Sequence, residues 1–246
     1  MKLRLLSYNI KSGGRQREEP LARVISAFDP DVVLLQEATR PEVLERIALL
    51  TGMAAWGCQP GESLGFLARQ RVAHAAWIKP RVSRHAFIEI VPAAADWRLF
   101  GVHLSAVHAA WTEQRRRFEM RALLGAIRAH QHGPHVLMGD FNTLAPGEWL
   151  DIWKLPARLR ALVWMSGGSI RWRTIQVILD AGYVDAFKCR QPDAIGHTFP
   201  TWDPHLRLDY LFAPAAFVPR VSVCRVAMTD DTRQASDHFP LLAELD

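Results

Sequence analysis

Five short apolar runs constrain the fold of this 246-residue chain more than any other feature of its sequence. Each run ends in polar residues or contains them, and the runs cover residues 3–10, 32–37, 99–105, 136–142 and 208–212. Their length and their content of Val, Ile, Phe and Tyr are typical of buried β-strands. Because helical patterns lie between them, the alternation predicts an α/β fold class.

The predicted helices have apolar residues at helical spacing. They cover residues 20–28, 41–50, 111–130 and 175–181. The third contains an apolar stripe formed by Met120, Leu123, Leu124 and Ile127. Such a stripe is typical of a helix that covers a sheet. Pro20 and Pro41 stand in the expected first turns of the first two helices, where proline is favoured.

Composition narrows the class of protein. Hydrophobic residues make up 49% of the chain and charged residues 22%, a globular ratio that excludes disordered, collagen-like and membrane-spanning classes. The sequence has no internal repeat and no long linker, which favours a single domain over residues 1–246. The net charge of +5 favours a polyanionic partner, but only weakly.

Cysteine usage and the start of the sequence bear on location. Cys58, Cys189 and Cys224 are far apart and odd in number, which argues against a disulfide framework or a cysteine-rich zinc site. No apolar stretch is long enough for a signal peptide or a bilayer span. We therefore expect a cytoplasmic monomer without a transmembrane segment.

Polar motifs recur where the predicted strands end. Such residues cost free energy when they are buried without partners, so their recurrence predicts a shared hydrated or metal-filled site at one edge of the sheets. The six motifs are Tyr8-Asn9, Gln36-Glu37, His103-Leu104, Gly139-Asp140-Phe141-Asn142, Arg207-Leu208-Asp209-Tyr210 and Ser236-Asp237-His238. Taken singly, each is more often a turn former, a helix cap or a solvated pair. Their joint presence favours a site.

In this order the motifs resemble the signature of the endonuclease/exonuclease/phosphatase superfamily, which has the DNase I-like fold, and the resemblance covers nearly the whole chain. It implies an α/β (α+β) four-layer sandwich, with two mixed β-sheets packed face to face and helices on the outside. It also implies a metal-dependent phosphoric ester hydrolase, most readily a phosphodiesterase that works by in-line attack of water.

The resemblance implies a site for Mg²⁺, with Mn²⁺ as a possible substitute. Mg²⁺ prefers hard oxygen ligands and keeps several waters, so a few protein ligands suffice. We expect Glu37 to bind the ion directly, with Asn9 and Asp237 as its neighbours.

The same resemblance assigns catalytic roles. His103, as an imidazolium, and Asn142 would contact the phosphoryl oxygens, and Asp140 would orient or deprotonate the attacking water. Asp209 would fix the tautomer of His238 and leave the other ring nitrogen facing the phosphate. Either Asp140 or His238 is the general base, and the sequence leaves this choice open.

Other functions compete with this interpretation. Residues 61–65 match G-x-S-x-G, and Asp209 and His238 follow Ser63 in the order of a serine esterase, but a strand is expected after Ser63 where a nucleophile elbow needs a helix. A histidine-rich zinc site is disfavoured, because the histidines match no closed ligand set and are expected at the surface or at helix ends. They are His103, His108, His130, His132 and His135. A catalytically silent module that binds a phosphorylated ligand is the third possibility.

Two basic segments bear on partners. Arg115, Arg116 and Arg117 are expected on a solvated helix face. Residues 149–173 interleave tryptophans with arginines, which could stack bases or lie at a lipid surface, although packing onto the sheet is the favoured explanation for most of them.

The substrate classes left open are DNA or RNA, phospholipid headgroups and inositol phosphates, and peripheral membrane contact is possible. An abasic-site endonuclease is disfavoured, because Ala38-Thr39-Arg40 and His205-Leu206-Arg207 depart from the motifs of that branch.

Overall fold

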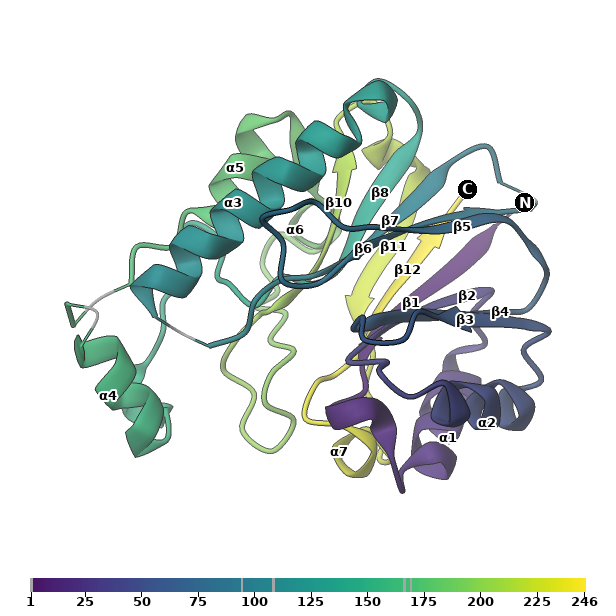
Figure 1. The fold of residues 1–246 in the computed structure, drawn as a ribbon, viewed down its shortest axis with the longest axis horizontal. Coiled ribbons are helices and arrows are strands. Elements are labelled where there is room, and N and C mark those ends of the chain that lie inside the picture. Colours follow the sequence, from purple (N-terminus) through teal and green to yellow (C-terminus); the bar gives the residue numbers. More distant parts are fainter. Residues whose placement is uncertain (1, 94, 108, 166, 169) are drawn as a thin grey trace.

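Two mixed sheets of six strands each pack face to face, with helices on their outer sides (Figure 1). The computed structural model describes residues 2–93, 95–107, 109–165, 167–168 and 170–246. Helices α1 (Glu18–Phe28) and α2 (Pro41–Thr51) cover one sheet, and α3 (Ala110–Ala126) and α5 (Thr174–Asp180) cover the other. The predicted fold class and four-layer arrangement are confirmed.

The first sheet has a parallel pair at its centre. Its strands, in spatial order, are β11 (Val221–Val226), β12 (Leu241–Leu245), β1 (Leu3–Asn9), β2 (Val32–Gln36), β4 (Leu64–Ala68) and β3 (Ala55–Cys58). Only β1 and β2 pair in parallel among these described strands, and α1 connects them. The carboxyl ends of β1 and β2 therefore lie at the same sheet edge.

The second sheet repeats this plan. Its order is β5 (Val72–Ile78), β6 (Phe87–Pro92), β7 (Arg98–His103), β8 (His135–Asp140), β10 (Asp209–Pro214) and β9 (Tyr183–Asp185). Strands β7 and β8 form its parallel pair and are connected by α3. Both parallel pairs direct their carboxyl ends to the lower side of Figure 1.

Short helices complete the chain. They are the α-helices α4 (Ala157–Met165), α6 (Ala186–Arg190) and α7 (Thr232–Ala235), and the 3₁₀ turns η1 (Ser12–Gly14), η2 (Arg128–His130), η3 (Ile152–Lys154) and η4 (Val218–Arg220). Figure 1 shows α4 standing away from both sheets at the lower left. No helix in the described part of the chain is long and apolar enough to cross a membrane.

Three apolar layers hold the sandwich together. The central layer joins the sheets through side chains such as Leu34 and Phe66 from one and Ile88 and Met138 from the other. The outer layers pack α1 and α2 on the first sheet and α3 and α5 on the second. Burial of these side chains is the main stabilising contribution.

The predicted elements are present with shifted ends. The helix predicted over 111–130 ends as α3 at Ala126, and a 3₁₀ turn follows. Its apolar stripe is confirmed, since Met120, Leu123 and Ile127 are buried. The prediction of a solvated arginine face is wrong at Arg116, which is fully buried against Glu113.

Candidate active site

The predicted site residues come from strand ends that meet at one edge of the two sheets. Asn9, His103 and Asp140 are the last residues of β1, β7 and β8, and Glu37 directly follows β2. Strand β10 is antiparallel to β8, so its first residue, Asp209, pairs in register with Asp140. The other predicted residues follow β8 or precede β12, and they are Asn142, Asp237 and His238.

Asn9 links the two sheets. Its Nδ2 donates to Asp140 Oδ2 at 3.0 Å and to Glu37 Oε1 at 3.3 Å. Its Oδ1 accepts from the backbone N–H of Lys11 at 2.9 Å. In this arrangement the amide orients two carboxylates, because its oxygen is already engaged. The metal-ligand role of Asn9 stays a prediction.

The backbone takes unusual conformations beside the carboxylates. Glu37 has φ of 57° and Asn142 has φ of 52°, both in the left-handed region that non-glycine residues rarely adopt. Such conformations cluster at functional sites. Gly139 is required by contact instead, since a Cβ there would lie 1.9 Å from the Val102 carbonyl oxygen of β7. The glycine thus lets β7 and β8 bring His103 beside Asp140.

His238 faces two carboxylates. Its Nδ1 lies 2.9 Å from Asp209 Oδ2, and its Nε2 lies 3.9 Å from Asp140 Oδ2. The ring also contacts Phe199, with centroids 4.8 Å apart. All of these polar groups are buried. The structure therefore brings Asp140, Asp209 and His238 together, with one atom from each within 4.8 Å of the others.

His103 approaches the same carboxylate from the other side. Its Nε2 lies 3.9 Å from Asp140 Oδ2, and its Nδ1 lies 2.9 Å from Ser63 Oγ. The His85 ring stacks on it with centroids 5.1 Å apart. These two contacts hold the ring plane and leave Nε2 directed at the site.

The environment separates the charge states of the two histidines. Burial, together with the neighbouring His85 and His238, lowers the pKa of His103 to about 3. Burial also lowers the pKa of His238, but Asp209 and Asp140 outweigh it and raise the pKa to about 9. Near pH 7 these shifts favour a neutral His103 and a protonated His238, and the phosphoryl contact of His103 stays a prediction.

Asp140 has a raised pKa of about 7. Burial is the largest cause, opposed by His238 and supported by the neighbouring carboxylate of Asp209. The backbone N–H of Asn142 donates to Asp140 Oδ1 at 2.8 Å, so both oxygens of this carboxylate are held in place.

The side chains of Asn142 and Asp237 bond to groups outside the cluster of Asp140, Asp209 and His238. Asn142 Nδ2 donates to the Leu104 carbonyl at 3.1 Å, beside the end of β7. Asp237 forms an ion pair with Lys11, whose Nζ lies 3.2 Å from Oδ2. Asp237 is next to His238 in the chain, but it is not part of the buried cluster of Asp140, Asp209 and His238.

The residues present fit a divalent cation. Oδ1 of Asp209 is buried and has no hydrogen-bond partner among the described residues. Such an orphaned carboxylate oxygen needs a cation or a proton. Glu37 is only partly buried, and Asn9 links it to Asp140 of the same cluster. Carboxylate oxygens are the ligands that Mg²⁺ and Mn²⁺ prefer.

Sequence reasoning missed the residues that hold the site from behind. Thr198 Oγ1 accepts from the backbone N–H of Asp209 at 3.3 Å, and Ser236 Oγ donates to the Asn9 carbonyl at 2.6 Å. His197-Thr198-Phe199-Pro200 is a visible motif upstream of Asp209, and it was the one available signal for Thr198.

The structure agrees with the case against a serine esterase and corrects the expectation for the histidines. Ser63 precedes β4 and is followed by a strand, and it is buried against His103, so it is not at a nucleophile elbow. The histidines do not form a surface set either, because His135 is buried and bonded to Tyr183 Oη at 2.7 Å. His108 lies outside the described residues.

Three solved structures share the fold over 99% of this chain. An endonuclease/exonuclease/phosphatase from Beutenbergia cavernae has 22% identity and a TM-score of 0.73, with 71% of its own chain covered. The 3′ phosphatase NExo from Neisseria, bound to product DNA hairpin, has 18% identity, a TM-score of 0.71 and 99% coverage. An AP endonuclease from Archaeoglobus fulgidus has 17% identity, a TM-score of 0.73 and 99% coverage.

Sequence comparison supplies the family. No curated protein matches the chain with significant similarity. The model of the endonuclease/exonuclease/phosphatase family matches residues 6–238, from β1 to the catalytic histidine candidate. The chain therefore belongs to the endonuclease/exonuclease/phosphatase family and is a phosphoric ester hydrolase of the nuclease and phosphatase type.

Proposed function

We propose that the protein is a Mg²⁺-dependent phosphodiesterase, with Mn²⁺ as a substitute, that acts on nucleic acid or on phospholipid headgroups. The observation that carries the proposal is the buried cluster of Asp140, Asp209 and His238, which is joined through Asn9 to Glu37. Acidic, imidazole and amide groups converge here at the edge shared by both sheets.

The cation supplies neutralising charge for the phosphoryl oxygens when it is bound. Glu37 would hold it, as the family resemblance implies, and Oδ1 of Asp209 is a further carboxylate oxygen without a hydrogen-bond partner among the described residues. Asn9 donates to both Glu37 and Asp140 and thereby fixes the positions of the two carboxylates.

Asp140 and His238 divide the proton chemistry. Asp140 is fixed through both oxygens and can orient a water for in-line attack. His238 keeps Nδ1 on Asp209, which leaves its Nε2 to donate to a phosphoryl oxygen or to the leaving group. His103, oriented by Ser63, offers a second contact from the opposite side.

Nucleic acid is one substrate class because NExo and the AP endonuclease, whose folds this chain shares, are named for activities on DNA. Cleavage at abasic sites is disfavoured by Ala38-Thr39-Arg40 and His205-Leu206-Arg207, which depart from that branch. Phospholipid headgroups are the other substrate class, because their phosphodiester offers the site the same phosphate group as a nucleic acid.

The test is hydrolysis of bis(p-nitrophenyl) phosphate with Mg²⁺, with Mn²⁺ and with EDTA. We expect turnover with either metal and none with EDTA. Glu37→Gln should raise the metal concentration needed for half-maximal rate by about tenfold or more, whereas Glu42→Gln, at an exposed position of α2, should not. Inactivity of the wild type with both metals would overturn the proposal and support a silent phosphate-binding module.

A panel of substrates then separates the classes. Single-stranded DNA, RNA, abasic duplex, sphingomyelin, phosphatidylglycerol and inositol phosphates are compared under one metal condition. The class with the highest kcat/KM identifies the substrate. If inositol phosphates are the best substrates, the protein is a phosphomonoesterase and not a phosphodiesterase.

A further inference from the structure

Three of the four tryptophans of residues 149–173 are exposed, which contradicts the prediction that most of them pack on the sheet. Trp149 is 74% exposed, Trp153 79% and Trp164 78%. They belong to the loop before η3, to η3 and to α4. Monomeric proteins rarely leave several large apolar side chains this open at one place unless the surface contacts a partner.

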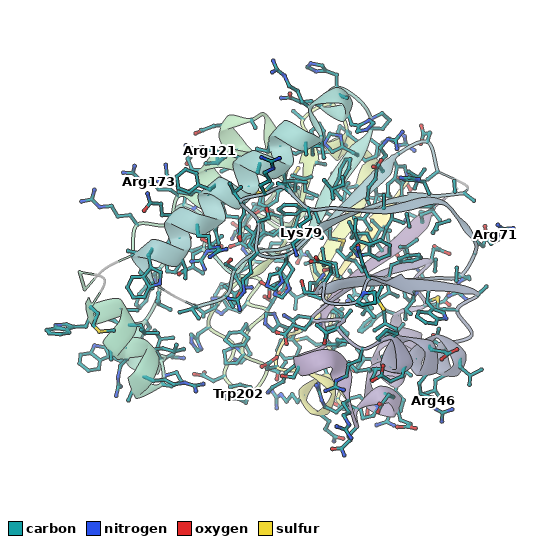
Figure 2. All side chains as sticks on the ribbon, viewed as in Figure 1. Arg46, Arg71, Lys79, Arg121, Arg173 and Trp202 are labelled. Atoms are coloured by element: carbon teal, nitrogen blue, oxygen red, sulfur yellow. The ribbon has the colours of Figure 1, made fainter. Side chains whose placement is uncertain are left out.

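The same surface continues to the rim of the active site. Lys154 of η3 bonds both carboxylate oxygens of Asp203 at 3.1 Å, and the adjacent Trp202 is 66% exposed. Lys11, the partner of Asp237, lies over the Trp202 ring at 5.7 Å. Figure 2 shows Trp202 at the lower side of the molecule, the side from which α4 also projects (Figure 1). We call Trp149, Trp153, Trp164, Met165 and Trp202 the tryptophan surface.

The charge of this segment is complementary to an anionic surface. Residues 149–173 contain five basic side chains against the single acidic residue Asp151. Asp151 caps the backbone of η3 by accepting from the Trp153 N–H at 3.0 Å. Arg158 and Arg171 are exposed, and Arg160 lies over the Trp153 ring at 5.8 Å.

The shape favours a lipid surface over a nucleic acid strand. A single strand is bound in a basic groove with stacking rings along it, but Trp164 belongs to α4, which projects away from both sheets (Figure 1), and Trp153 belongs to the neighbouring turn η3. The cavity between η3 and α4, of about 370 Å³, is lined mainly by apolar side chains that include Ile152, Ala161 and Val163. Interleaved Trp and Arg with apolar area between them is typical of segments that lie in the headgroup region of a bilayer.

We propose that the tryptophan surface docks this protein on an anionic phospholipid membrane and turns the active-site edge toward the lipid headgroups. Docking does not depend on the proposed phosphodiesterase activity. Trp153, Trp164 and Met165 enter the headgroup region, and Arg158 and Arg171 contact lipid phosphates. If both proposals hold, phospholipid headgroups become the favoured substrate class.

The experiment is vesicle flotation of the full chain in EDTA, so that binding is measured without turnover. The probes are vesicles of phosphatidylcholine alone and vesicles in which part of the lipid is phosphatidylglycerol. We expect flotation with the anionic vesicles, weakened by salt. Trp153→Ala/Trp164→Ala should weaken partitioning about tenfold or more, and Arg158→Gln/Arg171→Gln about fivefold for each charge removed.

Matched controls separate membrane docking from nonspecific effects of charge and of exposed apolar side chains. Arg71→Gln/Arg121→Gln removes two exposed arginines that Figure 2 shows away from α4, and Leu49→Ala removes an apolar side chain of α2 that is 72% exposed. Both controls should float like the wild type. All variants should hydrolyse the soluble chromogenic diester at the wild-type rate, because none changes a site residue.

Two results would overturn the proposal. One is wild-type flotation that the tryptophan and arginine variants leave unchanged. The other is a wild type that binds no vesicles but binds fluorescent oligo(dT), with this binding lost in the tryptophan and arginine variants. That result would show that the surface is a nucleic acid site. Failure of the chromogenic assay would contradict the proposed function and leave the flotation result standing.

Discussion

The two parallel strand pairs share a topology but differ in what holds their connecting helices. Strands β1 and β2 deliver Asn9 and Glu37 to the site, and β7 and β8 deliver His103 and Asp140. Helix α1, between the first pair, packs through apolar side chains such as Leu21, Val24 and Ile25. Helix α3, between the second pair, also buries three charged residues.

Three charged side chains of α3 hold loops rather than strands. Glu113 accepts from Thr143 and Thr174, and Arg116 donates from Nη1 to the Ser105 carbonyl at 2.8 Å. Glu119 accepts from Ser105 Oγ at 2.8 Å. Ser105 follows His103, and Thr143 follows Asn142, so this network fixes the chain on either side of the site. Apolar contacts position elements, whereas hydrogen bonds specify the course of irregular backbone.

The largest effect is expected for Glu113→Ala. The change leaves the guanidinium of Arg116, which is fully buried, without its carboxylate. Breaking a buried pair in this way costs about 3–5 kcal/mol of the free energy of unfolding. Urea denaturation measures the loss, and Gln114→Ala, at the neighbouring exposed position, serves as the control. A loss below about 1 kcal/mol would show that the charged network contributes little to stability.

Ile25→Ala tests the apolar counterpart in α1. The side chain is fully buried against the first sheet, so its truncation should cost about 2–5 kcal/mol through lost burial and a residual cavity. The rate with the chromogenic diester, measured under folding conditions, should stay near wild type. Glu113→Ala should lower it, because the loops beside His103 and Asn142 lose their anchor. Equal loss of activity in both variants would remove the distinction between the helices.

Acid should weaken α3 more than α1. Burial tends to raise the pKa of Glu113, but Arg116 and the hydrogen bonds from Arg173, Thr143 and Thr174 outweigh it and hold the pKa below its usual value. A carboxyl with a lowered folded-state pKa stabilises the protein above its unfolded pKa of about 4.3, and this contribution is lost as the pH falls through the folded value.

Urea denaturation from pH 7 to pH 3 checks this expectation. The stability difference between the wild type and Glu113→Gln should be constant above about pH 5 and should shrink below it. The difference between the wild type and Ile25→Ala should change little over the same range. A constant Glu113 difference down to pH 3 would contradict the assignment.

The smallest effect is expected for Arg46→Gln. Arg46 Nη2 lies 3.5 Å from Glu19 Oε1 and links α2 to α1, with both side chains about half exposed. Exposed pairs contribute about 0.2–1 kcal/mol. The melting temperatures of this variant and the wild type, measured at low and at high salt, should differ little. A large salt-sensitive loss of stability would show that charged pairs also hold the helices of the first sheet.

The contrast also explains what the sequence could predict. Strands β1 and β2 and helix α2 could be predicted from their apolar residues, because the spacing of these residues indicates which side chains are buried. Edge strands β3 and β5 were missed, because they are mostly half-exposed and lack strict alternation. The inward Arg116 could not be foreseen, because arginine is rarely fully buried.

The site was predictable to the extent that its residues form motifs in the chain. The ordered motifs led to Asn9, Glu37, His103, Asp140 and His238, which the fold places at one edge. Ser63 acts through a hydrogen bond to His103 of another strand, so nothing in its neighbouring sequence marks that contact, whereas Thr198 lies in the visible motif before Asp209. Packing on the sheet was favoured for the tryptophans of residues 149–173 because tryptophan is highly buried on average, and their sequence does not show which of them are exposed.

The most direct test of the account is the rate of metal-dependent phosphodiester hydrolysis in Asp140→Asn and His238→Ala. Each removes one member of the buried cluster, and His132→Ala and Asp193→Asn remove exposed residues of the same types. We predict that kcat falls by about 100-fold or more in both cluster variants, as for loss of a positioned acid or base, and not in the controls. Unchanged kcat in the cluster variants would contradict the assignment of the active site.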